Sequence, residues 1–169
     1  MAVESCLLQL HAMQQPNISY ETTLLSATSG ASAFFTEHLN SFEVWLSFGG
    51  HGAGSNESPI HLPILLQVLL SQSHRMKALQ LLRKYLCQGP EAANSALLVG
   101  IFPYILKLLQ NSDSQIRQVL IAIWTYIIGF DCSCRIELVR DKSLPVFTQC
   151  LVSRDAPMKL RSMAAFVVA

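Results

Sequence analysis

Three basic residues recur at one place in a repeated pattern, and their spacing is the clearest sign of a binding function. Lys77, Arg117 and Arg161 each take the second position of similar segments, MKAL, IRQV and LRSM. Ammonium and guanidinium groups bind carboxylates and phosphates. If these segments stack, the three residues form a ladder that lines a groove for an acidic peptide or a partner subunit. The alternative is a solvated face that keeps an apolar repeat protein soluble.

Other patterns that could support catalysis or metal binding are incomplete. Cys87 and His74 could form a nucleophile pair, but no local signature accompanies them. Cys132 and Cys134 are separated by one residue, whereas zinc sites usually use two to four. The Gly-rich run at 49–55 has no following lysine and no preceding strand, so it does not form a phosphate loop. We therefore expect no catalytic residue, no cofactor and no metal site.

The composition describes an apolar chain with few charges. Of its 169 residues, 51% are hydrophobic and 14% are charged, against about 25% charged in an ordinary soluble domain. Every Lys and Arg lies at or after Arg75, and residues 1–74 contain only carboxylates among their charged groups. This asymmetry indicates either a basic binding face or the chance composition of a short excerpt. The net charge of +1 gives no drive towards nucleic acid, so we expect no nucleic-acid partner.

Neither a membrane span nor an export signal is predicted. The longest apolar run, Val119 to Phe130, is shorter than the ~20 residues that cross a bilayer. The N-terminus has Glu4 where a signal peptide carries basic residues. Five unevenly spaced cysteines are typical of free thiols in a reducing compartment. The sequence predicts a cytoplasmic protein without direct membrane insertion.

The second half of the chain repeats with a period of about 40 residues. Pro63, Pro103 and Pro145, spaced 40 and 42 residues apart, each stand near the start of an apolar helix, where proline is tolerated. A longer apolar helix follows each of them, and Glu91–Val99 and Ser133–Arg140 can each add one more. Three helices per period of this length are typical of armadillo repeats. Such units are stabilised by stacking on their neighbours.

These patterns define the expected organisation of the chain. Residues 1–33 are predicted as a helix over 2–14 followed by a Ser/Thr-rich loop over 15–33. Residues 34–58 form a helix and a Gly-rich linker, and residues 59–169 form the armadillo-type repeats. These repeats are truncated, because Ala169 falls inside an apolar helix that begins near Pro157. The predicted fold is all-α, a right-handed solenoid of the armadillo or HEAT type with about three partial to complete repeats.

Several blocks of this repeat region show a more specific resemblance. Leu62–Gln72, Ser73–Leu82, Val99–Gln110 and Asp131–Asp141 resemble the Raptor family, the regulatory-associated proteins of TOR. The resemblance covers roughly residues 34–169. The sequence departs from the family after Gly89-Pro90, where Glu91 stands in the place of a frequent tryptophan.

The resemblance implies a non-catalytic scaffold in the TOR kinase complex. It implies binding to TOR kinase, recruitment of substrates that carry a TOR-signalling motif, and contact with Rag-type small GTPases at the lysosomal or vacuolar surface. The alternative is an armadillo adaptor of the nuclear-import or catenin kind, which binds an extended peptide. Those families place Trp and Asn at regular intervals on the groove helix, whereas Trp124 stands alone here. An enzyme is the third hypothesis, which a deep polar pocket lined by Cys87 or His74 would support.

Overall fold

The computed structural model describes residues 20–48, 60–111 and 113–169. The predicted helix over 2–14 and the Gly-rich linker lie outside these residues. Within them the structure is helical and contains no strand. The elements, in chain order, are α2 (Tyr20–Ser47), α3 (His61–Leu70), α4 (Arg75–Leu86), α5 (Pro90–Leu98), α6 (Phe102–Asn111), α7 (Ser114–Phe130), the 3₁₀ turn η1 (Cys132–Cys134), α8 (Arg135–Arg140), α9 (Leu144–Val152) and α10 (Met158–Val168).

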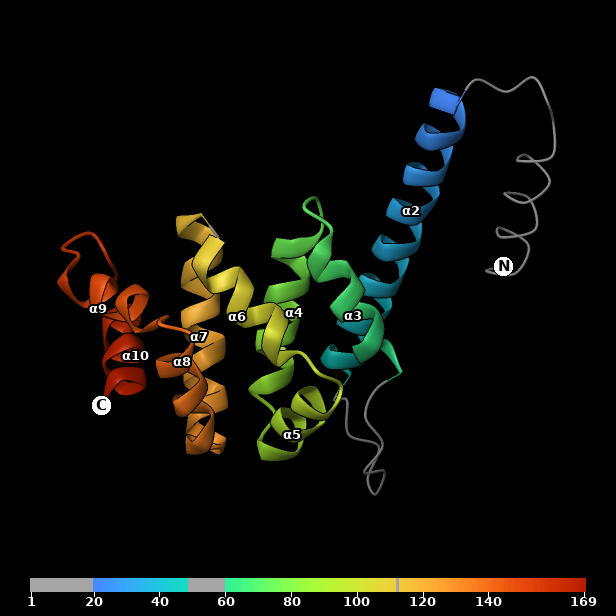
Figure 1. Ribbon diagram of the computed structural model, residues 1–169. Helices are drawn as coiled ribbons and strands as arrows, with labels where there is room; N and C mark the ends of the chain where they lie inside the picture. Colours follow the sequence, from blue (N-terminus) through green and yellow to red (C-terminus); the bar gives the residue numbers. More distant parts are fainter. Residues whose placement is uncertain (1–19, 49–59, 112) are drawn as a thin grey trace.

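The predicted repeat is confirmed. The proline helices are α3, α6 and α9, the longer helices are α4, α7 and α10, and the third helices are α5 and the η1–α8 pair. The repeats stack side by side, so that α2 and α10 lie at opposite ends of the array (Figure 1). The long helices pack in order, α4 on α7 and α7 on α10. The fold is an all-α solenoid.

Each proline helix buries the same positions. The residues two places after the prolines, Leu65, Ile105 and Phe147, are fully buried. The polar residues four places after the prolines, Gln67, Lys107 and Gln149, are exposed. Positions three to four residues apart share one face of a helix. The buried positions therefore form one apolar stripe that faces the long helices, and the polar positions lie on the other side. The buried stripes join into one continuous core.

Local signals fix where the helices begin and end. The Asp113 side chain accepts a hydrogen bond from the Ile116 amide at 2.9 Å and caps α7, which satisfies a donor left free at a helix start. Arg75 donates from Nε to the Leu69 carbonyl at 2.8 Å and so closes the end of α3. The third helices end at Gly100 and Lys142, both in the left-handed region, with φ of 88° and 57°. Such a residue is the usual stop signal of a helix.

The predicted loop over 15–33 is wrong from Tyr20 onward, because α2 begins there and runs without a break to Ser47. Ser and Thr are poor helix formers but cost only a few tenths of a kcal/mol each, and no proline stands within residues 20–47. The second half of α2 packs on α3 and α4, with Leu39 and Phe42 fully buried. This packing anchors one continuous helix across the expected boundary at residue 34.

Among the described helices, none is both long and apolar enough to cross a membrane by itself. Only when taken together are the segments 90–98 and 102–110 long and apolar enough to cross a membrane, and the two segments meet at a bend of 88°.

Candidate protein-binding surfaces

The three predicted basic residues all lie in the first turns of long helices, Lys77 in α4, Arg117 in α7 and Arg161 in α10. None of these first turns contains an acidic residue, although carboxylates are the side chains that a helix N-terminus favours. Since the three helices pack in sequence, the basic residues recur once per repeat, as the sequence predicts. Their surroundings, however, differ from one repeat to the next.

Lys77 is engaged by α2. Its Nζ lies 3.2 Å from Glu43 Oε2 and donates to Asn40 Oδ1 at 2.6 Å. Lys84, two turns further along α4, lies 3.6 Å from the other Glu43 oxygen. The hydrogen bond and charge of Lys77 hold the pKa of Glu43 below its ordinary value, with a smaller contribution from Lys84. Lys77 therefore ties α2 to α4, a role that the sequence pattern does not reveal.

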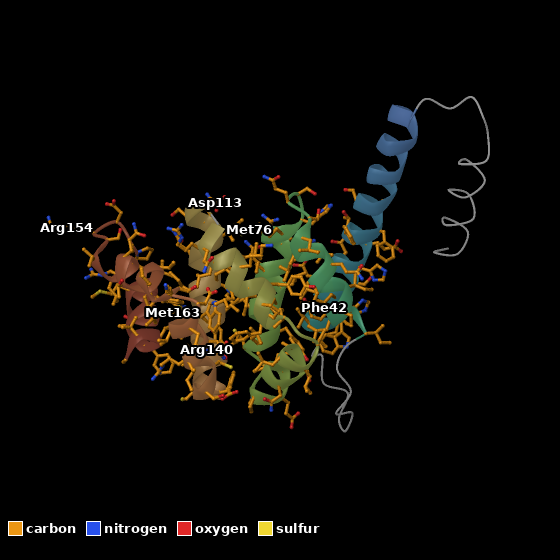
Figure 2. The ribbon with its side chains drawn as sticks, viewed as in Figure 1. Phe42, Met76, Asp113, Arg140, Arg154 and Met163 are labelled. Carbon is orange, nitrogen blue, oxygen red and sulfur yellow. The ribbon has the colours of Figure 1, made fainter. Side chains whose placement is uncertain are left out.

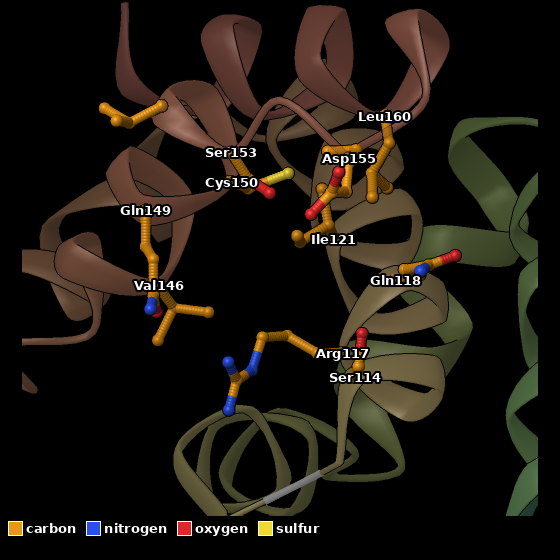
Figure 3. Close-up of a pocket in the computed structure, with 12 residues that line it drawn as sticks. Ser114, Arg117, Gln118, Ile121, Val146, Gln149, Cys150, Ser153, Asp155 and Leu160 are labelled. Atoms are coloured by element: carbon orange, nitrogen blue, oxygen red, sulfur yellow. The ribbon is translucent and has the colours of Figure 1, made fainter.

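Arg117 reaches into a hollow between repeats. Figure 3 shows its guanidinium directed into a cavity of about 430 Å³ that α7, α9 and the segment before α10 enclose. The Cys150 thiol lines the same cavity, and burial raises its pKa, partly offset by the positive charge of Arg161. Arg161 itself is exposed on α10. Arg117 and Arg161 thus lie on either side of one inter-repeat junction, whereas Lys77 belongs to the contact with α2.

A second hollow lies across the long helices and was not predicted. It has a volume of about 490 Å³, and we call it the long-helix groove. Residues of α4, α7 and α10, with Pro157, line it: Met76, Gln80, Arg83, Lys84, Cys87, Gln115, Gln118, Val119, Ala122, Tyr126, Pro157, Lys159, Leu160 and Met163. Met76 and Met163, labelled in Figure 2, come from the two helices that flank α7.

The long-helix groove combines a basic rim with an apolar floor. Arg83, Lys84 and Lys159 line it, and no Asp or Glu does. Tyr126 stands on the floor, where a hydrogen bond with the Cys87 thiol raises the pKa of its hydroxyl, as does partial burial. The spacing of polar residues along α4 could have indicated this face, because Gln80, Arg83 and Lys84 recur at intervals of three to four residues, which places them on one side of a helix.

The geometry separates the residues of the proposed nucleophile pair. Cys87 lines the long-helix groove, but no His, Asp or Glu lines it with Cys87, so the thiol has no such base beside it there. His74 precedes α4 and Cys87 follows it, so the helix separates them by about 18 Å at 1.5 Å per residue. The His74 ring hydrogen-bonds to Ser32 Oγ at 2.9 Å instead. Burial, with the nearby carboxylate of Asp131, raises the pKa of Cys134 to about 11, which suits an inert thiol. No cluster of three potential metal ligands occurs within the described ranges.

Trp124 also has a different role from that of a groove tryptophan. It is fully buried and packs edge-on against Phe102 of the neighbouring proline helix, with ring centroids 5.1 Å apart. A side chain in this position fills the core and cannot contact an extended peptide. The nuclear-import and catenin interpretation loses the one residue that could have supported it.

Comparisons with known proteins bear on the family. A scan against protein-family models finds no match. The chain is 48% identical over its whole length to regulatory-associated protein of TOR 2 from Oryza sativa subsp. japonica, of which it covers 12%. It is 40% identical to target of rapamycin complex 1 subunit mip1 from Schizosaccharomyces pombe, covering 99% of this chain and 13% of that one.

A solved structure agrees with these relatives. The crystal structure of Chaetomium thermophilum Raptor matches with a TM-score of 0.69 and 38% identity, over 80% of this chain and 13% of that one. The chain therefore spans about an eighth of the length of the curated relatives it matches. The resemblance seen in the sequence is confirmed, because this chain is similar along its whole length to one segment of Raptor-family proteins.

Proposed function

We propose that this chain is a non-catalytic scaffold segment that acts in the TOR kinase complex by presenting stacked helices to protein partners. The observation that carries the proposal is the identity to Raptor-family proteins along the whole chain. One of these relatives is named as a subunit of target of rapamycin complex 1. A solenoid suits such a role, because its stacked repeats expose an extended surface.

The partners we propose are TOR kinase, TOR substrates that carry a TOR-signalling motif, and Rag-type small GTPases. The location we propose is the cytoplasm, with recruitment to the lysosomal or vacuolar surface. These proposals follow from the family resemblance. The basic residues of the ladder supply one chemical means of contact, since Arg161 is exposed and guanidinium groups bind carboxylates in a bidentate manner.

The test is purification of the tagged complete protein from its own cells, with partners identified by mass spectrometry. We expect TOR kinase in near-stoichiometric amounts, with TOR substrates and Rag-type GTPases recovered after mild crosslinking. Fluorescence microscopy of the same tagged protein should show it in the cytoplasm and on lysosomes or vacuoles. Recovery of karyopherins or cadherin-type tails in place of the kinase would overturn the proposal.

Charge reversal then tests the basic residues. Arg161→Glu should reduce recovery of a partner that uses this surface, whereas Arg154→Glu, an equal change of charge at an exposed residue between α9 and α10, should not. Lys77→Glu is a poor choice, because it would place a second carboxylate against Glu43 and loosen α2. Equal recovery with Arg161→Glu and Arg154→Glu would remove Arg161 from the proposed contact.

A further inference from the structure

The long-helix groove has the dimensions of a single α-helix. Its lining residues on α7 extend from Gln115 to Tyr126, which is about 16 Å, or three turns, at 1.5 Å per residue. On either side α4 and α10 pack against α7, each at an interaxial distance of about 8–10 Å. A helix with its side chains is about 10 Å wide, so one helix fits along α7 between its two neighbours.

The floor of the groove offers an apolar strip. Met76, Val119, Leu160 and Met163 are all half-buried and line it, on three different helices. Methionine side chains are flexible and polarizable, so they adapt to the shape of an apolar partner. The strip therefore suits the apolar face of an amphipathic helix, which carries such side chains at intervals of three and four residues.

The rim sets the charge of the partner. Arg83 and Lys159 are exposed and come from the two opposite walls, α4 and α10. Lys84 joins them, and although it lies 3.6 Å from Glu43, its side chain is 55% exposed. With three cations and no carboxylate among the lining residues, the complementary partner is acidic.

The polar side chains of the groove disfavour an extended peptide. The amide and carbonyl groups of an extended peptide need hydrogen-bond partners in the groove. The backbone groups of the helical walls cannot serve, because they are already paired within their own helices. Gln80, Gln115 and Gln118 line the groove, but none of them has an amide side chain at the equivalent position of a neighbouring repeat. They therefore do not form the once-per-repeat row of amides that would pair with a regularly repeating backbone, whereas a helix brings its backbone already paired.

We infer that the long-helix groove binds an acidic amphipathic α-helix of about three turns. Its apolar face packs on α7, and its carboxylates lie against Arg83 and Lys159 on the two walls. The inference extends the proposed scaffold role by naming the chemistry of one partner. It does not depend on that partner being TOR kinase or one of its substrates.

The first test measures binding of a model helix by fluorescence anisotropy. The probe is a fluorescein-labelled 14-residue peptide of Leu, Ala and Glu with blocked ends, with Leu on one helical face and Glu on the other. The protein is the complete natural chain. Two control peptides replace every Glu by Gln, or two central Ala by Pro. We expect at least tenfold weaker binding of both controls, since one lacks the charge and the other the helix.

Protein variants locate the site. Arg83→Glu combined with Lys159→Glu should weaken the binding at least tenfold. Lys142→Glu combined with Arg154→Glu makes the same change of charge at exposed residues outside the groove, and should change the Kd less than twofold. Equal binding by the two double variants, or equal binding of the proline peptide, would overturn the inference.

A crosslink gives an answer that does not depend on the folding of a charge variant. Cys87 is an exposed thiol in the groove, whereas Cys132 is exposed outside it. A bromoacetyl group at the end of the Glu peptide should alkylate Cys87, as mass spectrometry would show, and unlabelled peptide should suppress the reaction. Preferential labelling of Cys132, or labelling that Cys87→Ser leaves unchanged, would contradict the proposed location.

The two proposals fail separately. Loss of peptide binding in the groove variant, with TOR kinase still recovered, would support the groove and leave the scaffold role intact. Peptide binding by a protein that recovers no TOR kinase would support the groove and overturn the scaffold role. Failure of the peptide to bind the wild-type protein would overturn the groove alone.

Discussion

Gly100 and Lys142 occupy equivalent positions in successive repeats, three residues before Pro103 and Pro145, and both adopt a left-handed backbone conformation. In each case the next amide reaches back to close the preceding helix, from Ile101 to the Ala96 carbonyl at 3.3 Å and from Ser143 to Leu138 at 3.0 Å. The same helix stop is thus built once with glycine and once with a residue that resists this conformation.

This difference predicts opposite effects of two substitutions. The left-handed conformation costs a non-glycine residue about 1–2 kcal/mol. Glycine avoids this cost, but it loses about 0.5–1 kcal/mol more conformational entropy on folding. Lys142→Gly should therefore stabilise the α8–α9 turn by about 0.5–1 kcal/mol. Gly100→Ala should destabilise the α5–α6 turn, although no heavy atom lies within 4 Å of the added Cβ. Native-state hydrogen exchange of the flanking helices measures both, and a slower exchange with Gly100→Ala would contradict the assignment.

The contact between Glu43 and Lys77 predicts a salt-dependent attachment of α2. Both side chains are 41% exposed, so salt screens the pair. Because the pKa of Glu43 is lowered, the ionised carboxylate stabilises the folded state above the ordinary pKa of 4.5, and this contribution is lost as the pH falls through the lowered value. Hydrogen exchange of α2 should become faster in 1 M salt in the wild type. Glu43→Gln should remove that dependence, with Glu37→Gln as the control on the same helix.

The histidine contacts predict that acid weakens the docking of α2 on α3. The rings of His38 and His61 lie 5.7 Å apart across the two helices, and His61 Nδ1 is buried without a hydrogen-bond partner among the described residues. Burial, and then the charge of His38, lower the pKa of His61 below its ordinary 6.5. The neutral ring therefore favours the folded state at pH values above 6.5, and this stability is lost as the pH falls through the lowered pKa.

The measurement is the protection factor of α2 and α3 amides, which corrects for the pH dependence of exchange itself, between pH 7.5 and pH 5. Protection should fall with acid in the wild type. His61→Leu, which keeps the volume and cannot titrate, should flatten the dependence. A wild-type protection factor that does not change over this range would rule out this role of His61.

The burial of Trp124 predicts a graded loss of stability. Trp124→Ala should cost about 3–5 kcal/mol, because it removes a large buried side chain and leaves a cavity. Trp124→Phe should cost less, since the indole Nε1 is buried and has no partner among the described residues, so its loss removes an unsatisfied donor. Hydrogen exchange of α6 and α7 reports both changes. Equal costs for Ala and Phe would show that the ring contact with Phe102 contributes nothing.

The repeat could be predicted from the sequence because its signals are local. Prolines in the first turn and an apolar residue two places later are both visible along the chain, and α3, α6 and α9 follow them. The length of α2 could not be predicted in this way. Its Ser/Thr-rich first half has weak propensities, and its second half is stabilised by burial of Leu39 and Phe42 against residues distant in the sequence.

The candidate site was likewise predictable in part, where its signals are local in the sequence. The sequence predicts that Lys77, Arg117 and Arg161 recur once per repeat, and they do stand in equivalent first turns. The function of this set stays a prediction. Which residue is engaged depends on contacts between elements far apart in the chain, such as that of Glu43 with Lys77. The long-helix groove was missed for the same reason, because it exists only where three helices meet.

The shape of the long-helix groove depends on two junctions, α4 with α7 and α7 with α10. Contacts in a solenoid connect neighbouring repeats, so a small rotation at either junction widens or narrows the groove without breaking a helix. A partner bound there would resist such rotation and stiffen the array along its length. Binding would thereby become sensitive to mechanical tension, since any force that straightens or curls the stack changes the affinity.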